Sequence, residues 1–443
     1  MAESGSAFAA AALGSAFRSR DFRLYQSARL MVILGAEAQS VAVAWQVYQI
    51  THSALALGYT GLALFLPGLF FMLGAGHVAD LYDRRKIILT CYGLQAVCTA
   101  GLLYLSLTNT QRIWPIYAVL VGIGLGRCFS GPAASAMLPS LVPKEHFVNA
   151  VTWGATVYQI ANMSGPAVGG LLFTLPLAVL FGGALARWNG ASIVYAFTLL
   201  MLLGFIVLVG MIRTPVQQKD KKSFDVRTML AGLEYVWRTK LLLGSISLDL
   251  FAVLLGGSVA LLPIFATEIL HAGPRGLGLL RAMPSVGSLA VSLTMVVRPI
   301  KRRAGLTMMV CVAIFGAATV VFGLSRSFWL SMATLVVVGA SDMVSVVVRS
   351  SVLQLATPPE MRGRVSAVNW LFIGASNEFG EFESGLTAHW WGAVRAVVIG
   401  GIGSMVVTAS AAGLFPELRR ADALTSESLQ GAELELSTAE PVD

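Results

Sequence analysis

Charged residues are scarce in this chain, and their scarcity excludes an ordinary soluble domain. Only 12% of the 443 residues are Asp, Glu, Lys or Arg, about half the share found in soluble globular proteins. Cysteine is scarcer still: Cys91, Cys98, Cys128 and Cys311 lie in or beside apolar segments, without CxxC or Cys/His ligand spacing. The sequence therefore predicts neither a disulfide framework nor a zinc site, and ordinary packing is the simpler role for these cysteines.

The common signatures of enzymes are also missing. No phosphate-binding loop of the form GxxxxGK[ST] occurs, so we do not expect this chain to hydrolyse ATP. The five histidines are scattered near the ends of apolar runs and form no HExxH pair. We therefore expect a protein that is not an enzyme and that requires no cofactor or metal ion.

Long apolar runs are what the chain has in abundance. Hydrophobic residues make up 56% of the sequence, and the mean hydropathy is +0.74. A helical run of about 20 such residues crosses a hydrocarbon core of ~30 Å, whereas a membrane β-barrel shows weak alternation over roughly ten-residue strands. We thus expect an all-α membrane protein. Its twelve spans are predicted at about residues 24–50, 57–79, 87–108, 114–140, 148–175, 190–212, 243–268, 276–297, 304–325, 328–355, 364–389 and 393–415.

The predicted spans divide into two sets of six around one polar stretch. An internal repeat supports this division, because LVPKEHFVNAVTW (141–153) is echoed by ATPPEMRGRVSAVNW (356–370). Many secondary transporters build their substrate site at the interface between repeated halves. The expected parts are a cytoplasmic N-terminal segment (1–23), a six-helix half (24–212), a cytoplasmic linker (213–242), a second six-helix half (243–415) and an acidic, disordered cytoplasmic tail (416–443).

The net charge of +8 reflects membrane orientation rather than a surface for nucleic acid. With the N-terminus in the cytoplasm, 22 of the 31 Lys and Arg residues fall in cytoplasmic segments, five in the opposite loops and four inside spans. Positive charge concentrates in the short cytoplasmic loops of membrane proteins. Both termini are therefore predicted to be cytoplasmic, and the lipid bilayer, not nucleic acid, is the expected partner of the surface.

The loop after the second span carries a distinctive charge pattern. Residues 76–86 read GHVADLYDRRK, which resembles the G-x-x-x-D-R-x-G-R-R signature of the major facilitator superfamily. The resemblance implies a cytoplasmic gate in which Asp80 and Arg84 stabilise the outward-open state. An ordinary positively charged cytoplasmic loop is the alternative. The matching positions are Gly76, Asp80, Arg84 and Arg85, whereas Leu81 and Asp83 replace the Arg and Gly of the pattern.

The fifth span contains a second motif, NMSGPAVGG (162–170). It is similar to the G-P-x-x-G-G antiporter motif of the same superfamily, which is associated with exporters. Its matching positions are Gly165, Pro166, Gly169 and Gly170, while Ala161 replaces an upstream Gly. Small residues also allow close helix packing and proline bends a helix, so packing alone is the alternative explanation.

The similarity covers about residues 17–415 and is closest to one branch of the superfamily. The segments that carry it include FRLYQSARL (22–30), LPSLVPKE (138–145), LLPIFATEIL (261–270) and SNEFGEFESG (376–385). Together they resemble the twelve-span branch of enterobactin-exporter-like and macrolide-efflux-like proteins. This implies a major facilitator fold, in which two pseudo-symmetric six-helix halves work by alternating access.

The same resemblance implies a function. It predicts a proton-coupled exporter of an amphipathic small molecule, a siderophore or a drug-like compound, acting as a monomer in the bacterial inner membrane. Nutrient uptake and lipid flipping are alternatives within transport, and the antiporter motif argues against uptake. A scaffold or receptor without transport is disfavoured, because the loop motif and the buried charges are largely present.

Ionisable residues inside the spans are the candidate functional groups, since each is costly in lipid unless it is paired or hydrated. They are Arg29, Glu37, Arg127, Asp249, Arg281, Asp342, Arg349 and three glutamates of span 11. Superposing the halves through Pro143 and Pro358 places Arg127 opposite Asp342, and an echo between spans 1 and 7 places Arg29 opposite Asp249. We hypothesise that Arg127 and Asp342 pair in one conformation and separate in the other; a static ion pair is the alternative.

Carboxylates within the spans are the candidates for proton coupling, because a carboxyl group in a low-dielectric site exchanges protons closer to neutral pH than one in water. They are Glu37, Asp249, Asp342, Glu378 and Glu381. The last two, in NEFGEFESG (377–385), share a helix face, whereas Glu383 points elsewhere. We expect the three glutamates to line a water-filled outer cavity. Alternatively, Gly380 and Gly385 let the span pack tightly while the glutamates pair with neighbouring groups.

A further set of polar residues is predicted to contact the substrate in the cavity: Arg29, Gln39, Gln46, Arg127 and Glu383. Gln39 and Gln46 are seven residues apart and present one hydrogen-bonding stripe, or else they only satisfy polar groups between helices. The arginines suit an anionic siderophore, while the carboxylates suit a lipophilic cation. Composition alone does not choose between these substrates.

Overall fold

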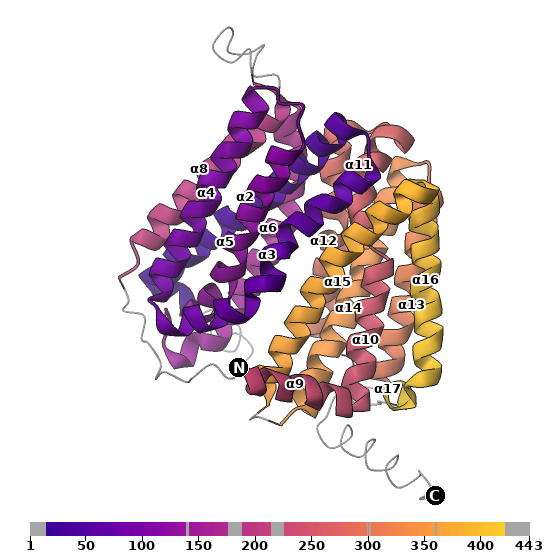
Figure 1. The fold of residues 1–443 in the computed structure, drawn as a ribbon. Coiled ribbons are helices and arrows are strands. Elements are labelled where there is room, and N and C mark those ends of the chain that lie inside the picture. The colour runs from indigo at the N-terminus through magenta and orange to yellow at the C-terminus, as the bar shows by residue number, and fades with distance from the viewer. Residues whose placement is uncertain are drawn as a thin grey trace, which may run out of the picture. The chain divides into compact units, whose positions relative to one another are not determined.

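Helices dominate the computed structural model, which describes residues 15–138, 141–175, 188–213, 226–298, 300, 303–358 and 361–420; no strand occurs in these ranges. The long helices of this part of the chain (Figure 1) are α2 (Arg20–Thr51), α3 (Ala54–Leu81), α4 (Arg84–Leu107), α5 (Trp114–Met137), α6 (Phe147–Phe173), α8 (Gly190–Gly210), α10 (Lys240–Leu255), α12 (Gly273–Val297), α13 (Ala304–Leu324), α14 (Phe328–Ala356), α15 (Arg362–Trp391) and α16 (Ala393–Leu414). The shorter ones are η1 (Ser15–Arg18), η3 (Lys144–His146), α9 (Val226–Arg238), η5 (Ser258–Leu261), α11 (Leu262–Ile264), η6 (Phe265–Ile269) and α17 (Pro416–Arg420).

Ten of the described helices are long and apolar enough to cross a membrane. The remaining long helices, α6 with 27 residues and α15 with 30, also exceed the length of about 20 residues that a span needs. Helices suit this environment because they satisfy every backbone polar group internally. The predicted all-α membrane fold is confirmed, and the long helices of the described residues overlap the predicted spans.

Polar residues cap several of these helices where the chain enters them. Ser19 accepts a hydrogen bond from the amide of Phe22 at the start of α2, at 3.4 Å. Asn189 accepts one from the amide of Ser192 at the start of α8, at 2.9 Å. Such caps satisfy amides that have no partner within the helix.

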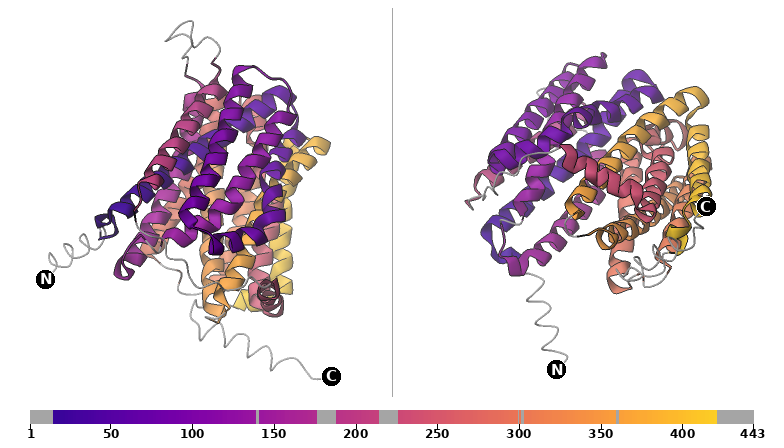
Figure 2. Two further views of the ribbon diagram at one scale, coloured as in Figure 1. Left: turned by 60° about the vertical axis from the view of Figure 1, so that its left-hand side comes forward. Right: turned by 60° about the horizontal axis from the view of Figure 1, so that its bottom comes forward.

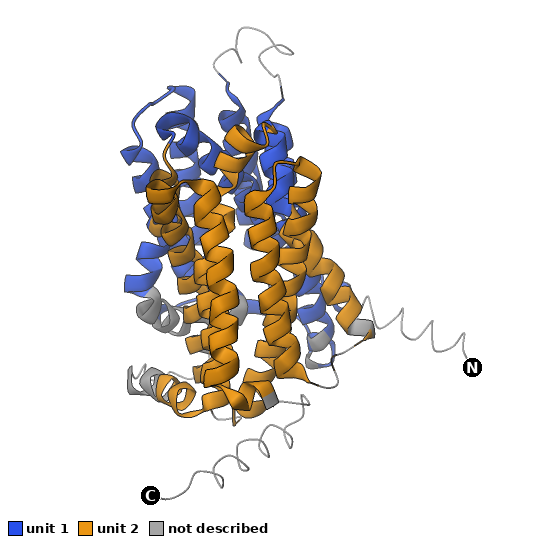
Figure 3. Cartoon of the chain, turned by 90° about the vertical axis from the view of Figure 1, so that its right-hand side faces the viewer, with its two compact units in different colours: residues 1–52, 63–222, 273–282 blue, residues 53–62, 223–272, 283–443 orange. Residues whose placement is uncertain are grey.

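The chain divides into two compact units, which are coloured separately in Figure 3. Unit 1 comprises Met1–His52, Ala63–Lys222 and Gly273–Ala282. Unit 2 comprises Ser53–Leu62, Ser223–Ala272 and Met283–Asp443. The first residues of α3 thus group with unit 2, and the first residues of α12 group with unit 1.

The two units repeat one pattern of helix packing. In unit 1, α2 packs against α6 and α8, and α4 packs against α5 and α8. In unit 2, α10 corresponds to α2 and packs against α15 and α16, while α13 corresponds to α4 and packs against α14 and α16. Figure 1 labels these helices, and Figure 2 shows them from two further sides. The internal repeat of the sequence therefore corresponds to a repeat in the structure.

The seventh predicted span is interrupted, although the sequence predicts it as one segment over 243–268. Helix α10 ends at Leu255, and the chain continues through η5, α11 and η6 to Ile269. Gly257 lies at the interruption, where an added Cβ would come within 2.8 Å of the carbonyl oxygen of Gly380 on α15. Only glycine permits such a close backbone approach, and hydropathy does not reveal it.

Two short helices extend unit 2 beyond its predicted spans. Helix α9 lies across the end of the unit at which α10 begins (Figures 1 and 2), and the hydroxyl of Tyr235 donates to the carbonyl of Ala356 at 2.9 Å. In α17, Leu418 is buried in the same apolar cluster as Val236 of α9. The folded part therefore includes much of the predicted linker and the first residues of the predicted tail. Residues 214–225 and 421–443 lie outside the described residues.

Candidate functional site

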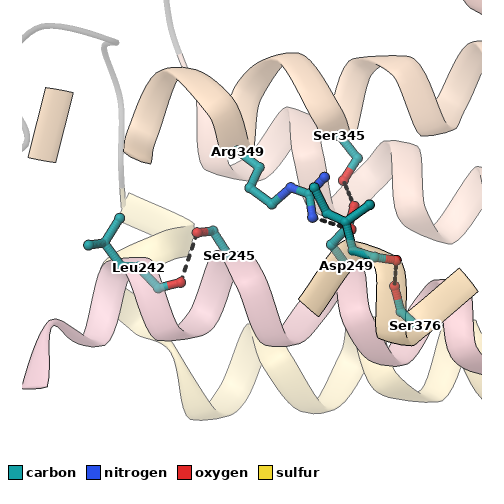
Figure 4. Close-up of polar contacts among 7 residues, drawn as sticks. Leu242, Ser245, Asp249, Ser345, Arg349 and Ser376 are labelled. Carbon is teal, nitrogen blue, oxygen red and sulfur yellow. Dashed lines mark hydrogen bonds and ion pairs between the residues drawn. The ribbon is translucent and has the colours of Figure 1, made fainter. Parts of the chain in front are cut away.

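The charged centre of unit 2 is an ion pair between α10 and α14 (Figure 4). Nη1 of Arg349 lies 2.5 Å from Oδ2 of Asp249, and Oγ of Ser345 donates to Oδ1 of the same carboxylate at 3.1 Å. The side chains of Arg349 and Asp249 are only 3% and 6% exposed. A buried charge costs several kcal/mol unless a partner compensates it. This pair therefore explains how both helices tolerate a charge at membrane depth.

A second carboxylate lies beside this ion pair. Asp342 precedes Ser345 and Arg349 by three and seven residues on α14, so the three share a helix face. Asp342 interacts electrostatically with Asp249 and Arg349. Asp342 and Asp249 also line one small cavity with room for about one water molecule. Two carboxylates thus surround one guanidinium, and a single proton makes the cluster neutral.

The sequence predicts Asp249 and Asp342 as proton-coupling residues and identifies Arg349 only as an ionisable residue inside a span, without a specific role, while Ser345 was not predicted. The signal that points to them is the spacing along α14, which brings Asp342, Ser345 and Arg349 to one face. The alignment of the two halves instead predicts partners for these carboxylates in the other half of the chain. The partner of Asp249 within unit 2 is a residue of its own half.

Unit 1 contains the two arginines predicted for the substrate cavity. Arg29 of α2 lies beside Gly154 of α6, where an added Cβ would be 2.9 Å from Nη1 of the arginine. Arg127 of α5 is exposed. Both arginines interact electrostatically with the hydroxyl of Tyr92 on α4. Residues from three helices of unit 1 therefore meet around one tyrosine.

The two glutamines predicted as a polar stripe form hydrogen bonds to different neighbouring helices. Oε1 of Gln39 accepts from the hydroxyl of Thr99 on α4 at 3.0 Å. Oε1 of Gln46 accepts from the hydroxyl of Tyr195 on α8 at 2.6 Å. Each glutamine thus ties α2 to another helix of unit 1, which matches the packing alternative for these residues.

The glycine motif of α6 faces two neighbours within unit 1. A Cβ on Gly165 would come within 2.5 Å of Cβ of Glu37, and one on Gly169 would come within 2.7 Å of the backbone of Ala38, so this face packs against α2. Gly170 approaches the backbone of Gly278 on α12 instead, and so does the carbonyl of Pro166. The motif therefore has a packing function, and it holds the stem of Glu37 against α6.

The loop motif is only partly described. Gly76 and Asp80 belong to α3 by backbone, but their side-chain surroundings lie outside the described part. Asp83 accepts from the amide of Arg85 at 2.9 Å and so caps α4, which gives the departure from the family pattern a local reason. Nη2 of Arg85 donates to the carbonyl of Gly210 at the end of α8, and Arg84 also has an interaction. A cation at a helix C-terminus is favourable.

The glutamates of α15 lie in unit 2 near the first turns of α3. A Cβ on Gly61 would be 2.8 Å from Oε2 of Glu381 and 3.3 Å from Oε2 of Glu378, so both carboxylates reach one point. This agrees with the shared helix face predicted for residues three apart. Glu383 is partly buried, and whether the glutamates line an outer cavity stays a prediction.

The predicted pairings of Arg127 with Asp342 and of Arg29 with Asp249 join residues of different units, and they stay predictions. Among the residues that the structure describes, no group of three or more His, Cys, Asp and Glu side chains is arranged to hold a metal ion.

The fold defines the class of protein. A bacterial homologue of the human lysosomal transporter Spinster, in an inward-facing and occupied conformation, aligns with 90% of this chain and 98% of its own, at 14% identity and a TM-score of 0.68. A bacterial homologue of the iron transporter ferroportin aligns with 90% of this chain and 98% of its own, at 13% identity and a TM-score of 0.65. These likenesses show the fold alone, which is that of major facilitator transporters.

Sequence similarity narrows the class to a family. The family model described as transmembrane secretion effector matches residues 11–440, and the chain belongs to that family. The enterobactin exporter EntS of Shigella dysenteriae is 27% identical over 399 residues, covering 88% of each chain. The enterobactin exporter EntS of Citrobacter koseri is 27% identical over 397 residues, covering 89% of this chain and 88% of its own.

These findings confirm the superfamily and the branch that the motifs indicated. The protein is a secondary transporter of a small molecule, embedded in the membrane by many spans. Its relatives place it in the bacterial inner membrane.

Proposed function

We propose that the protein exports an amphipathic small molecule, a siderophore or a drug-like compound, in exchange for protons. It does so by alternating access, as a monomer with both termini in the cytoplasm. Relatives named enterobactin exporters, each similar over 88% of its length, support export. The distribution of Lys and Arg between the loops supports the orientation.

The observation that carries proton coupling is the cluster of Asp249, Asp342 and Arg349. When Asp342 is protonated, the remaining ion pair between Asp249 and Arg349 is neutral and complete. When Asp342 loses its proton, it competes with Asp249 for one guanidinium, whose Nε is buried without a hydrogen-bond partner among the described residues. Protonation therefore changes how firmly α10 and α14 are joined, and it does so at a cavity that admits about one water molecule.

The test is transport by the full chain in proteoliposomes under an imposed pH gradient. Three substrates are compared: a catecholate siderophore, a macrolide and a lipophilic cation. We expect the gradient to accelerate transport of at least one substrate. Asp342→Asn, which mimics the protonated carboxyl, is expected to remove the acceleration while exchange without a gradient continues. Ser350→Ala on the exposed side of α14 is the matched control, and a gradient response in Asp342→Asn equal to that of the parent contradicts the assignment.

A lipophilic cation is the second candidate substrate, and the convergence of Glu378 and Glu381 at Gly61 favours it. Two carboxylates at one point attract positive charge. If this candidate is correct, Glu378→Gln and Glu381→Gln each slow transport of the cation and leave transport of the siderophore unchanged.

A further inference from the structure

Unit 1 holds a cluster of polar side chains in which the Tyr92 hydroxyl is hydrogen-bonded to Ser130, whereas two buried amides have atoms without a partner among the described residues. The cluster comprises Gln26 and Arg29 of α2, Tyr92 and Gln95 of α4, and Arg127 of α5. Arg29 and Arg127 both act on the Tyr92 hydroxyl. Tyr25 lies next to the cluster, because it interacts electrostatically with Arg29 and Tyr92. Three helices thus direct polar groups to one region of unit 1.

Two buried amides in this region lack partners. Gln26 is 2% exposed, and neither Nε2 nor Oε1 makes a hydrogen bond with the described residues. Gln95 is 6% exposed, and its Nε2 is likewise unbonded in this part of the chain. Leaving a buried polar group unpaired is costly, and the large majority of such groups in proteins are bonded. Both amides therefore call for a partner that the described residues do not supply.

The amides lie next to the arginines. A Cβ on Gly154 would be 2.9 Å from Nη1 of Arg29 and 3.5 Å from Nε2 of Gln26, so these two donors reach one point. A Cβ on Gly126 would be 3.2 Å from Nε2 of Gln95, and Gly126 directly precedes Arg127. Arg29 is thus accompanied by the amide of Gln26, and Gln95 lies three residues after Tyr92 on α4, the tyrosine with which Arg127 interacts.

The charge of the two arginines is not compensated by the described carboxylates of unit 1. None of the described carboxylates of this unit forms an ion pair with Arg29 or Arg127. Glu37 lies two turns further along α2, where its stem faces Gly165. A charge inside a membrane span is normally paired or serves a ligand.

The cluster lies at the depth expected of a substrate site. Arg29 is nine residues from the start of α2, Gln95 is eleven from the start of α4, and Arg127 is ten from the end of α5. At 1.5 Å per residue these positions lie roughly 14–17 Å along their helices, near the middle of a ~30 Å core. Secondary transporters bind their substrates near this midplane.

We propose that Arg29 and Arg127, together with Gln26, Gln95 and Tyr92, bind an anionic group of the transported molecule. The group is a carboxylate, phenolate or catecholate carried on an aromatic or apolar body. Guanidinium groups bind paired oxygen atoms bidentately, amide nitrogens add donors, and the tyrosine ring packs on an aromatic body. The inference rests on the proposed function, because it names the substrate class of that exporter.

The first test is thermal unfolding of the full chain in detergent with three probes of similar size. They are 2,3-dihydroxybenzoate as the anion, benzyl alcohol as the neutral probe and benzyltrimethylammonium as the cation. A ligand that binds the folded state raises the midpoint of unfolding, and we expect only the anion to raise it. Equal stabilisation by the neutral or cationic probe, or no stabilisation by the anion, overturns the proposal.

The second test uses variants. Arg29→Gln and Arg127→Gln are each expected to weaken binding of 2,3-dihydroxybenzoate about tenfold or more, the effect of losing a charged hydrogen bond. Arg112→Gln, which removes a positive charge from the exposed loop between α4 and α5, is the control and keeps the parental affinity. Parental affinity in both glutamine variants of the cluster overturns the proposal.

Gln26→Leu provides a readout that does not alter charge. It removes an unbonded amide, so the ligand-free protein is expected to unfold at a higher temperature while binding the anion more weakly. A rise in midpoint with unchanged anion affinity contradicts the assigned role of Gln26.

The addition of phosphatidylglycerol to the detergent distinguishes a lipid headgroup from a free anion as the ligand of this site. Displacement of the probe by this lipid, with the same dependence on Arg29 and Arg127, assigns the site to lipid and overturns the proposal.

The failure of this inference is distinguishable from failure of the proposed function. Asp342→Asn is expected to bind 2,3-dihydroxybenzoate with parental affinity and to lose only proton-driven transport. Anion binding through the arginines without any gradient-driven transport rejects proton-coupled export and leaves the anion site in place. Gradient-driven transport that is insensitive to Arg29→Gln and Arg127→Gln rejects the anion site and leaves proton-coupled export in place.

Discussion

Arg349 and Asp249 form a buried ion pair at 2.5 Å, and both residues belong to the second half of the chain. Their helices, α14 and α10, correspond to the predicted spans 10 and 7. Asp342 lies on the same face of α14 as Arg349, and it lines one small cavity together with Asp249. The pair and Asp342 together form the cluster to which the proposed proton coupling is assigned.

The first prediction concerns the cost of separating this pair. Arg349→Gln is expected to destabilise the protein by about 3–5 kcal/mol, because it leaves Asp249 buried without its partner. Asp249→Asn is expected to cost less, because Asp342 then compensates the charge of Arg349. The double variant is expected to recover part of this loss, since no charge then remains unpaired between the two positions. The measurement is a double-mutant cycle of thermal stability in detergent. Additive losses in the double variant would show that the two residues do not act as a pair.

The second prediction concerns the glycine face of α6. Gly169→Ala is expected to destabilise the protein by about 1–3 kcal/mol, the usual cost of overpacking, because the new Cβ would come within 2.7 Å of the backbone of Ala38. Gly93→Ala in α4 is the matched control, because nothing lies within 4 Å of its added Cβ. The midpoint of thermal unfolding distinguishes them. Equal midpoints for the two variants would mean that α6 does not pack on α2 through this face.

The third prediction concerns the hydrogen bond between Tyr195 and Gln46. Tyr195→Phe is expected to cost about 0.6 kcal/mol, the average for a hydrogen bond between membrane helices, because it removes the donor to Gln46 at 2.6 Å. Tyr104→Phe, at an exposed tyrosine of α4, is the control for loss of a hydroxyl. Thermal unfolding measures stability, and the same samples are assayed for transport. A transport defect without a loss of stability would favour substrate contact by Gln46 over packing.

Much of the fold follows from the sequence, because hydropathy and length specify helices in a membrane independently of their neighbours. The boundaries of α8, α13 and α16 lie within a few residues of the predicted spans. The break after Leu255 could not be predicted, since it depends on the approach of α15 to Gly257. Helix α9 was missed for a similar reason. Tyr235 donates a hydrogen bond to Ala356 of α14, and Val236 is buried in an apolar cluster, only once the other helices of unit 2 are packed together.

The candidate site likewise has one part that the sequence predicts and another that only the tertiary structure decides. The sequence by itself determined which ionisable residues lie inside spans, because a charge in an apolar run is visible in one dimension. Only the tertiary structure decided that Arg349 is the partner of Asp249 within unit 2, that Gln39 and Gln46 bond to different helices, and that the amides of Gln26 and Gln95 remain unbonded among the described residues. Ion pairs and hydrogen bonds form over about 3 Å between atoms of different helices, and the order of residues along one helix carries no record of which neighbour comes that close.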